Sequence, residues 1–549
     1  MIKRTRRYRR YRMLATLALA VGLAGPAVVP SLKPTRTLAA SPASLAASDG
    51  ILRMADEGEN DLKSIDPPVS SACDAQSGWV QSLIFGNLVR QDQNLAIQPD
   101  MASSYTVTND GRVYTFTLRP GLKFADGTPV TSDDVVYTLN RAFAPAYASG
   151  LVDYYLGHIV GGAAVSANKA KTVSGIKAIG ANKVQITLDH PEAVILNQLA
   201  YCVADVVPRH IVEKYGASWT DHALGTGPFY VKQWKHGQEI DLAPNPYYWR
   251  GKPKLKGIVV EFIQNTETAY NLYHTGGVDV MGIVNFPSNH IKDVQGTSDL
   301  HAHAHLFTEF LTFNARVKPF DNPLVRQAFS YAINRTTIAT LLNNRYLPAR
   351  TLLPPGMPGY NPNLAGETFD PARAKALLAK AGYPNGQGFP KITLNVDGGD
   401  NDGQTKAIAL KEFWQQVLGV NVGLNQLEHG AYLDSLTNKT YQIAFIQWGA
   451  DYPDPQDFLS LILQSKSGGN NGGYHNATFD SLTMQADVLP HDSPQRYKLY
   501  QQAEAIAMAD APIAVLDWGK YYILIRPSIK GLTVNSLGLA APNWADVTL

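Results

Sequence analysis

Beyond residue 48, segments typical of β-strands alternate with segments typical of helices. Val113–Leu118 has the β-branched and aromatic content of a strand. Lys183–Asp189 alternates apolar and polar residues, as a half-buried strand does. Between them, Thr131–Asp134 supplies capping residues for a helix expected over Val135–Phe143. This alternation favours a layered α/β fold over a helix bundle.

The second half of the chain continues the same pattern. Asp370 can cap a helix, Pro371 suits its first turn, and Gly382 is expected to end it. A further helix is predicted over Thr405–Leu418, followed by a strand over Val420–Leu427. Because about 500 residues follow residue 48, more than one domain is expected.

The amino terminus predicts where the protein works. Seven Lys or Arg lie within residues 1–12, Met13–Val29 is apolar, and small residues dominate Thr37–Ser48. These are the three parts of a secretory signal, with cleavage expected between residues 39 and 47. A retained membrane anchor is the alternative, but glycine and proline break the apolar stretch. No Cys follows that stretch, so a periplasmic or extracellular protein that is not a lipoprotein is expected.

Removing the first 48 residues changes the charge balance. They hold nine of the 48 Lys and Arg and no acidic residue, which leaves 39 basic against 46 acidic residues, a net charge of −7. This balance does not indicate a nucleic-acid partner. The two cysteines, Cys73 and Cys202, could pair in an oxidising compartment, and the sequence leaves that open.

Seven sequence blocks carry a resemblance to a known family. They are Trp79–Asp92, Pro99–Tyr105, Leu118–Val130, Gly225–Tyr230, Asn245–Pro253, Val325–Arg335 and Trp448–Pro455. In this order, over nearly the whole chain after residue 48, they resemble the extracellular solute-binding proteins of peptide ABC importers, the dipeptide and oligopeptide class of family 5. The resemblance implies a receptor that captures a small solute, most simply a short peptide, and delivers it to a membrane permease with its ATPases.

The resemblance also implies an architecture. Such receptors have a bilobed α/β periplasmic-binding-protein fold, with two lobes joined by a hinge and an extra domain inserted in the first lobe. The implied division is a signal over 1–48, lobe one over 49–86, 223–308 and 518–549, an inserted domain over 87–222, and lobe two over 309–517. The hinge crossings are expected near Phe307–Thr312 and Val515–Gly519.

Asp451 is the main candidate for ligand binding. It follows a predicted strand over Tyr441–Trp448, at a strand end where loops present functional groups. The resemblance implies that this aspartate pairs with a ligand α-ammonium, with Trp448 as an apolar wall and Tyr452 beside them. Alternatively, Asp451 and Asp454 cap the turn.

The sequence departs from the family where an arginine would bind a ligand carboxylate. Phe445 occupies one such position, and the loop 397–403 carries no arginine at the other. A dipeptide clamp is therefore not expected, since guanidinium is hard to replace for bidentate carboxylate binding. A longer peptide, or a cationic or neutral ligand, fits this pattern better.

Two further alternatives come from other residues. His301, His303 and His305 share one face if that segment is extended, and could ligate a metal. A receptor for a nickel or other metal complex, or for an oligosaccharide, is therefore the second hypothesis, although exposed histidines are the simpler interpretation. An exported hydrolase is the remote third, because the chain has no Gly-x-Ser-x-Gly, His-Glu-x-x-His or phosphate-binding loop. No cofactor is expected, and the protein is predicted to be a monomer.

Overall fold

The computed structural model describes residues 49–549 except 59, 148–150 and 399. The predicted signal, within residues 1–48, lies outside the described residues. Among the residues described, no helix is both long and apolar enough to span a bilayer.

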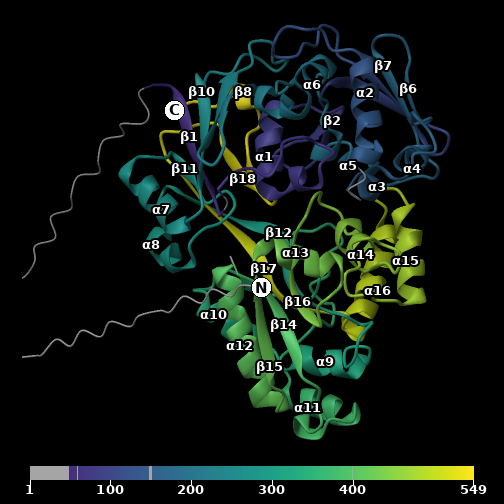
Figure 1. Ribbon diagram of the computed structural model, residues 1–549, viewed down its shortest axis with the longest axis vertical. Coiled ribbons are helices and arrows are strands. Elements are labelled where there is room, and N and C mark those ends of the chain that lie inside the picture. The colour runs from purple at the N-terminus through teal and green to yellow at the C-terminus, as the bar shows by residue number, and fades with distance from the viewer. Residues whose placement is uncertain (1–48, 59, 148–150, 399) are drawn as a thin grey trace, which may run out of the picture. The chain divides into compact units, whose positions relative to one another are not determined.

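An eleven-stranded mixed sheet organises most of the structure (Figure 1). Its order is β15-β14-β16-β12-β17-β11-β1-β10-β9-β8, with β13 also paired to β17. The strands are β1 (Ile51–Glu57), β8 (Phe229–Lys235), β9 (Glu239–Pro244), β10 (Gly257–Ile263), β11 (Val280–Met281), β12 (Leu300–Phe313), β13 (Leu347–Pro348), β14 (Ile392–Asp397), β15 (Val422–Leu427), β16 (Ile443–Gly449) and β17 (Ile513–Ile525).

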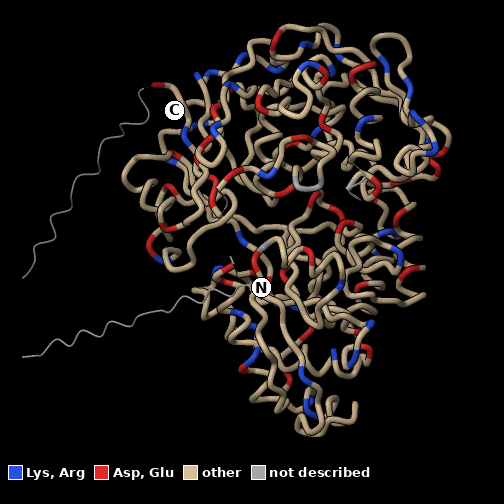
Figure 2. The backbone as a smooth tube through the Cα atoms, in the orientation of Figure 1, with Lys and Arg blue, Asp and Glu red and all other residues tan. Residues whose placement is uncertain are grey.

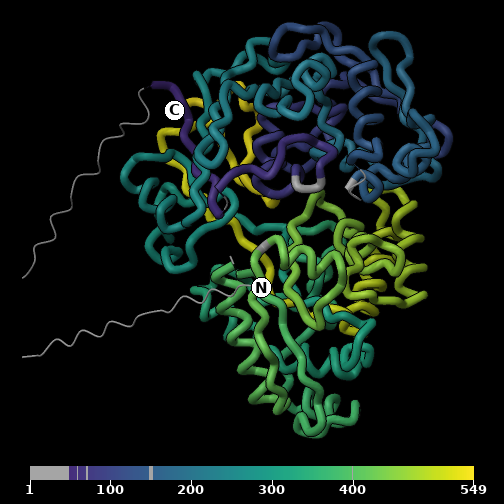
Figure 3. The backbone as a smooth tube through the Cα atoms, viewed as in Figure 1, coloured from purple at the N-terminus to yellow at the C-terminus, as the bar shows by residue number. Residues whose placement is uncertain are grey.

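The long antiparallel strands β12 and β17 join two halves of this sheet. The first half, β1 and β8–β11, attaches to β17 where Val280 pairs with Ile525. The second half, β14–β16, attaches to β12 where Phe310 pairs with Ile446. Colour along the chain shows the same arrangement: the yellow C-terminal segment returns from the green second half to the purple and teal first half (Figure 3).

A separate four-stranded antiparallel sheet, in the order β4-β5-β7-β6, lies within residues 102–187. We call this sheet with helices α2–α5 the four-stranded unit. Its buried core also contains Tyr452 and Leu461 from the second half, so the two regions pack together. Its elements are β4 (Ala102–Thr108), β5 (Val113–Leu118), α2 (Ser132–Ala142), α3 (Leu151–Leu156), α4 (Gly162–Ser166), β6 (Ile176–Ala178), β7 (Lys183–Thr187) and α5 (Ile195–Gln198).

The remaining helices cover the two halves of the large sheet. Those of the first half are α1 (Ala75–Ile84), α6 (Arg209–Tyr215), α7 (Thr266–Thr275) and α8 (Ile291–Val294). Those of the second half are α9 (Pro323–Tyr331), α10 (Arg335–Leu341), α11 (Pro371–Lys380), α12 (Asn401–Leu418), α13 (His429–Thr437), α14 (Gln456–Leu463), α15 (Ala477–Asp487) and α16 (Pro494–Asp510). Short hairpins β2 (Val89–Gln91) with β3 (Ile97–Pro99), and β18 (Thr533–Asn535) with β19 (Gly538–Ala540), complete the described strands.

Local chemistry explains where several predicted elements begin. The strand β5 has the predicted bounds, and Thr131 forms a capping box at the start of α2. Asp370 caps α11 by accepting a hydrogen bond from the backbone of Arg373 at 2.9 Å. Helix α12 begins four residues before the predicted Thr405, because Asp400 caps it by accepting from the Gly403 N–H at 2.9 Å.

Lys and Arg are interspersed with Asp and Glu along the described backbone (Figure 2). Both signs of charge are therefore distributed over the two halves of the large sheet and over the four-stranded unit.

Candidate functional site

Asp451 lies directly after β16, in the turn that leads to α14. The turn is fixed by Asp454, whose side chain accepts from the Gln456 N–H at 2.9 Å. The same carboxylate forms two hydrogen bonds with Arg496, at 2.6 and 2.7 Å, and both side chains are fully buried. Asp454 thus has the structural role that the sequence allowed for it, since an unpaired buried carboxylate would be costly.

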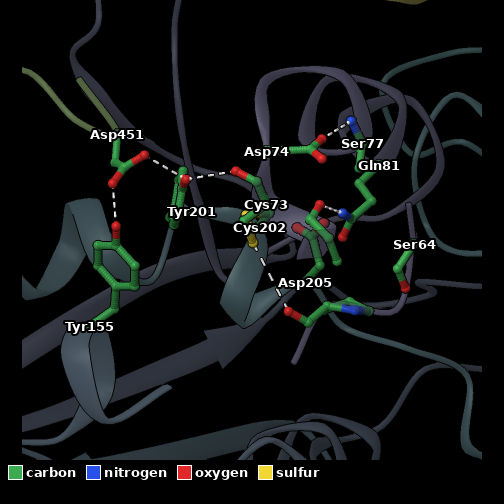
Figure 4. Close-up of a disulfide and its surroundings, with 12 residues drawn as sticks. Ser64, Cys73, Asp74, Ser77, Gln81, Tyr155, Tyr201, Cys202, Asp205 and Asp451 are labelled. Carbon is green, nitrogen blue, oxygen red and sulfur yellow. Dashed lines mark hydrogen bonds between the residues drawn. A yellow bond between two sulfur atoms is a disulfide. The ribbon is translucent and has the colours of Figure 1, made fainter. Parts of the chain in front are cut away.

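The Asp451 carboxylate faces two tyrosines of the N-terminal part of the chain (Figure 4). Tyr201 places its hydroxyl 2.5 Å from Asp451 Oδ1, and the Tyr155 hydroxyl donates to Oδ2. Tyr155 belongs to α3 and Tyr201 precedes Cys202, whereas Asp451 belongs to the second half. The site therefore lies where two regions distant in sequence meet.

A disulfide lies next to Tyr201 in the chain. Cys73 and Cys202, whose Cα atoms are 5.8 Å apart, are paired, which resolves what the sequence left open. The hydroxyl of Tyr201 lies 3.1 Å from the Cys73 carbonyl oxygen, as well as close to Asp451 (Figure 4). The disulfide thus anchors the segment that presents Tyr201 to the carboxylate.

Asp457, in the first turn of α14, lies behind Asp451. Its Oδ2 accepts from the Asp451 N–H at 3.1 Å and from Trp448 Nε1 at 3.2 Å. Its buried Oδ1 has no hydrogen-bond partner in the described part of the chain.

Burial sets the charge of this pair. Desolvation raises the pKa of Asp451 to about 6, although the tyrosine hydroxyls lower it. Burial and the nearby charge of Asp451 raise the pKa of Asp457 well above its ordinary value. Asp451 therefore ionises before Asp457, and the first ionisation places one negative charge on the pair. Among the described residues, no Lys or Arg forms an ion pair with either aspartate.

Trp448 and Tyr452 flank Asp451 in different ways. Trp448 is half-buried and lines a cavity of about 20 Å³ together with Phe310 and Ile446. That volume holds about one water. Tyr452 is fully buried, donates to Gln456 and packs against the four-stranded unit. Its contact with a ligand stays a prediction.

One edge of β16 lacks a strand partner beside Asp451. Its pairing with β14 ends at Ala444, whereas its other edge pairs with β12 as far as Gly449. The backbone from Phe445 to Gly449 therefore has an edge without a strand neighbour among the described residues. An extended peptide could add to such an edge.

The other positions singled out in the sequence have different surroundings. Phe445 is buried in the core of the second half. Of the segment 397–403, which was expected to be a loop, residues 401–403 belong to the first turn of α12, where Asp402 forms an ion pair with Arg345 at 2.8 Å.

The histidines of β12 do not converge on a metal site. His301 and His303 are exposed, as expected for an extended segment. The ring of His305 stacks on Tyr521, and its Nε2 lies 2.9 Å from the tyrosine hydroxyl. Burial lowers the pKa of His305 to about 3. None of these three belongs to a cluster of three metal-binding side chains in the described regions.

Sequence reasoning missed Tyr155, Tyr201 and the role of Asp457 at Asp451. The tyrosines are 296 and 250 residues away from that aspartate, and no local pattern connects them to it. For Asp457 the available signal is its distance of six residues from Asp451, across a turn and a helix start.

Comparisons with known proteins agree on one family. The family model described as bacterial extracellular solute-binding proteins, family 5 Middle, matches residues 96–470. The oligopeptide-binding protein OppA of Bacillus subtilis is 30% identical over 482 residues, covering 85% of this chain and 88% of that protein. The probable deoxycholate-binding periplasmic protein YgiS of Escherichia coli is 31% identical over 465 residues, with coverage of 82% and 86%.

A solved structure is similar over nearly its whole length. It is a periplasmic oligopeptide-binding protein, OppAIV, from Borrelia burgdorferi, with a TM-score of 0.79 and 29% identity. The match covers 91% of this chain and 99% of that one.

Proposed function

Because the chain belongs to the bacterial extracellular solute-binding proteins of family 5, we propose that it binds a short peptide between two lobes and delivers it to the permease of an ABC importer. The fold is the bilobed α/β fold of periplasmic binding proteins. The relatives are substrate-binding proteins rather than enzymes, and we assign no catalytic step to this chain.

We propose the lobe boundaries given by the resemblance. Lobe one comprises residues 49–86, 223–308 and 518–549, the inserted domain 87–222, and lobe two 309–517. In support, the pairing of β12 with β17 is irregular between Ala304 and Thr308, next to the first proposed crossing. The last part of the inserted segment, including Ile211 and Trp219, packs into the core of the first half.

The proposal depends most on the single negative charge shared by Asp451 and Asp457. An α-ammonium group would neutralise it and form charge-assisted hydrogen bonds to Asp451. Both oxygens of Asp451 already accept tyrosine hydroxyls, so ligand entry requires at least one of those contacts to yield. The free edge of β16 would hold the peptide backbone, and Trp448 would contact its first side chain.

Other ligand classes fit this charge less well. Deoxycholate, which appears in the name of one relative, is an anion that would be repelled by Asp451. The relatives do not favour the nickel-complex alternative, and an oligosaccharide would leave the carboxylate without a cation.

The proposed setting follows from the same family. We propose that the chain is exported by a cleaved signal, is not a lipoprotein, and acts as a monomer with a membrane permease and its ATPases. The names of YgiS and of the Borrelia protein describe periplasmic proteins.

The experiment compares matched peptides. Native mass spectrometry of the purified protein should first reveal the length of a co-purified peptide. Isothermal titration calorimetry then compares that peptide with its N-acetylated form, which lacks the ammonium. N-acetylation should weaken binding by about tenfold or more.

Variants separate the receptor function from the role of Asp451. Asp451→Asn should show the same loss, whereas Asp492→Asn, at a side chain 95% exposed, should bind normally. Equal binding of both peptide forms would refute the ammonium site alone. If no peptide binds and none changes the radius of gyration in solution scattering, the receptor proposal itself fails.

A further inference from the structure

Two histidines face each other at one end of the four-stranded unit, outside the Asp451 site. His158 lies two residues beyond α3, and Asp189 and His190 follow β7. The imidazole centroids of His158 and His190 are 4.1 Å apart, with an angle of 70° between the rings. The Asp189 Oδ1 lies 2.6 Å from His190 Nδ1 and 3.8 Å from His158 Nδ1.

The backbone holds these two segments together before any ligand is considered. The N–H of Asp189 donates to the carbonyl of His158 at 2.9 Å, and Ile159 forms an antiparallel bridge with Leu188. One ligand atom from each of the two histidines and Asp189 lies within 4.8 Å of the others. Ligand atoms around one transition-metal ion are separated by about 3 to 4 Å, given bonds of about 2.1 Å. Small side-chain rotations therefore suffice to bring the three atoms onto one ion.

A second observation points to a ligand here. Glu192 is only 3% exposed, yet its Oε1 has no hydrogen-bond partner in the described structure. Its Oε2 lies 3.6 Å from His158 Nε2 and 4.0 Å from His190 Nε2. Each imidazole thus has one nitrogen toward Asp189 and the other toward Glu192. Metal-binding histidines usually donate their second N–H to a carboxylate, and Glu192 Oε2 lies just beyond hydrogen-bond distance of both rings.

We propose that His158, Asp189 and His190 bind one divalent transition-metal ion of the Zn²⁺ type, with Glu192 orienting both imidazoles. Two imidazoles and one carboxylate suit Zn²⁺, Co²⁺, Ni²⁺ or Cu²⁺ rather than Mg²⁺ or Ca²⁺, which prefer oxygen ligands. Because Asp189 is exposed, water completes the coordination from the solvent side.

The ion would cross-link two segments that both contact the second half of the sheet. The helix α3, just before His158, contributes Tyr154, whose hydroxyl donates to the Leu461 carbonyl at 2.9 Å. After His190, the N–H of Ala193 donates to the Asp487 carbonyl at 3.3 Å. An occupied site therefore stiffens the edge of the four-stranded unit that meets helices α14 and α15.

The chain offers a matched control. His236 lies between two carboxylates, 2.9 Å from Asp61 and 3.2 Å from Asp221, but belongs to no cluster of three metal-binding side chains among the described residues. If any histidine among acidic groups captured metal, His236 would do so equally well.

The test uses the full protein, purified without an affinity tag and treated with a chelator. ZnCl₂ is titrated by calorimetry, and CoCl₂ by visible absorption, which reports the ligand field directly. One equivalent should bind. His158→Ala and His190→Ala should each weaken binding at least about tenfold, and Glu192→Gln by about 10- to 100-fold, as expected for a carboxylate behind the ligands. His236→Ala should bind like the unaltered protein.

Two further measurements keep the test independent of folding defects. Asp189→Asn changes an exposed side chain, so it should keep the cooperative unfolding transition while losing affinity. Hydrogen exchange should slow at Ile159 and Leu188 when Zn²⁺ is added. The proposal is overturned if neither metal binds below about 1 mM, or if the His158 and His190 variants bind as tightly as the unaltered protein. Loss of binding in His236→Ala alone would also overturn it.

Discussion

Acidification should weaken peptide binding through Asp451. A ligand ammonium pairs with the ionised carboxylate, and burial raises the pKa of Asp451 to about 6. The ordinary aspartate value is about 3.9, so an exposed aspartate would stay ionised across the range from pH 7 to pH 5. The peptide α-ammonium, with a pKa of about 8, stays protonated over the same range. Loss of affinity between pH 7 and pH 5 is therefore a signature of this half-buried, desolvated carboxylate.

The magnitude follows from the ionised fraction. With a pKa of about 6, Asp451 is ionised in about nine of ten molecules at pH 7 and about one in ten at pH 5. Affinity should fall about tenfold, equivalent to about 1.4 kcal/mol. Because Asp451 and Asp457 are close, the curve reports the first ionisation of the pair.

Calorimetric titrations at intervals between pH 5 and pH 8 measure this dependence. The N-acetylated peptide should show a flat profile, because it presents no ammonium to the carboxylate. The Asp451→Asn variant should bind weakly and without the tenfold change. The reasoning is refuted if affinity for the free peptide is constant or increases on acidification, or if Asp451→Asn keeps the slope.

Three sets of substitutions test the disulfide, the turn after β16 and the buried cation between β12 and β17. Cys73→Ser with Cys202→Ser should lower the free energy of unfolding by about 2–4 kcal/mol and weaken peptide binding; unchanged thermal melting and calorimetric affinity would contradict this. Arg496→Met leaves Asp454 buried without its partner and should lower the free energy of unfolding, measured by urea denaturation, by about 3–5 kcal/mol. Adding Asp454→Asn to this variant should restore part of the lost stability. Lys406→Met removes the cation between the buried carboxylates of Glu309 and Asp517, so a similar loss is expected, whereas an unchanged urea midpoint would contradict the pairing.

Local sequence signals predicted the elements but not how they meet. The capping residues Thr131 and Asp370 located the starts of two helices to within a few residues, because a helix terminus is determined by its nearest neighbours. The resemblance indicated Asp451, because the turn after β16 is encoded in one short block. The sequence did not predict which side chains surround that carboxylate.

That environment depends on long-range packing. Tyr155 and Tyr201 reach Asp451 only because the four-stranded unit packs on the second half through Tyr452. The histidine pair described above was missed for the same reason: His158 and His190 are brought together by a backbone bridge between the end of α3 and the end of β7. The spacings of His158, Asp189 and His190 along the sequence do not resemble a known metal-binding motif.

The charges at the proposed hinge crossings and at Asp451 are balanced differently, and the difference indicates how a ligand would drive the proposed closure. At the proposed crossings, Lys406 lies 3.0 Å from Glu309 and 2.8 Å from Asp517, and all three are buried. Burial and the nearby charge of Asp517 raise the pKa of Glu309 to about 8, although Lys406 lowers it. The two carboxylates on β12 and β17 thus share one buried cation.

Among the residues that the structure describes, Asp451 has no such cation as a partner. When the four-stranded unit closes on the second half, the hydroxyls of Tyr155 and Tyr201 satisfy its oxygens but not its charge. Burying that charge raises the free energy of the closed state unless a cation enters with it. A ligand ammonium removes this cost only in the closed state, so it has the differential affinity that shifts the population toward closure. Asp451→Asn should therefore do two things at once: weaken the peptide-bound closed form and, by removing the buried charge, make the ligand-free protein more compact in solution scattering.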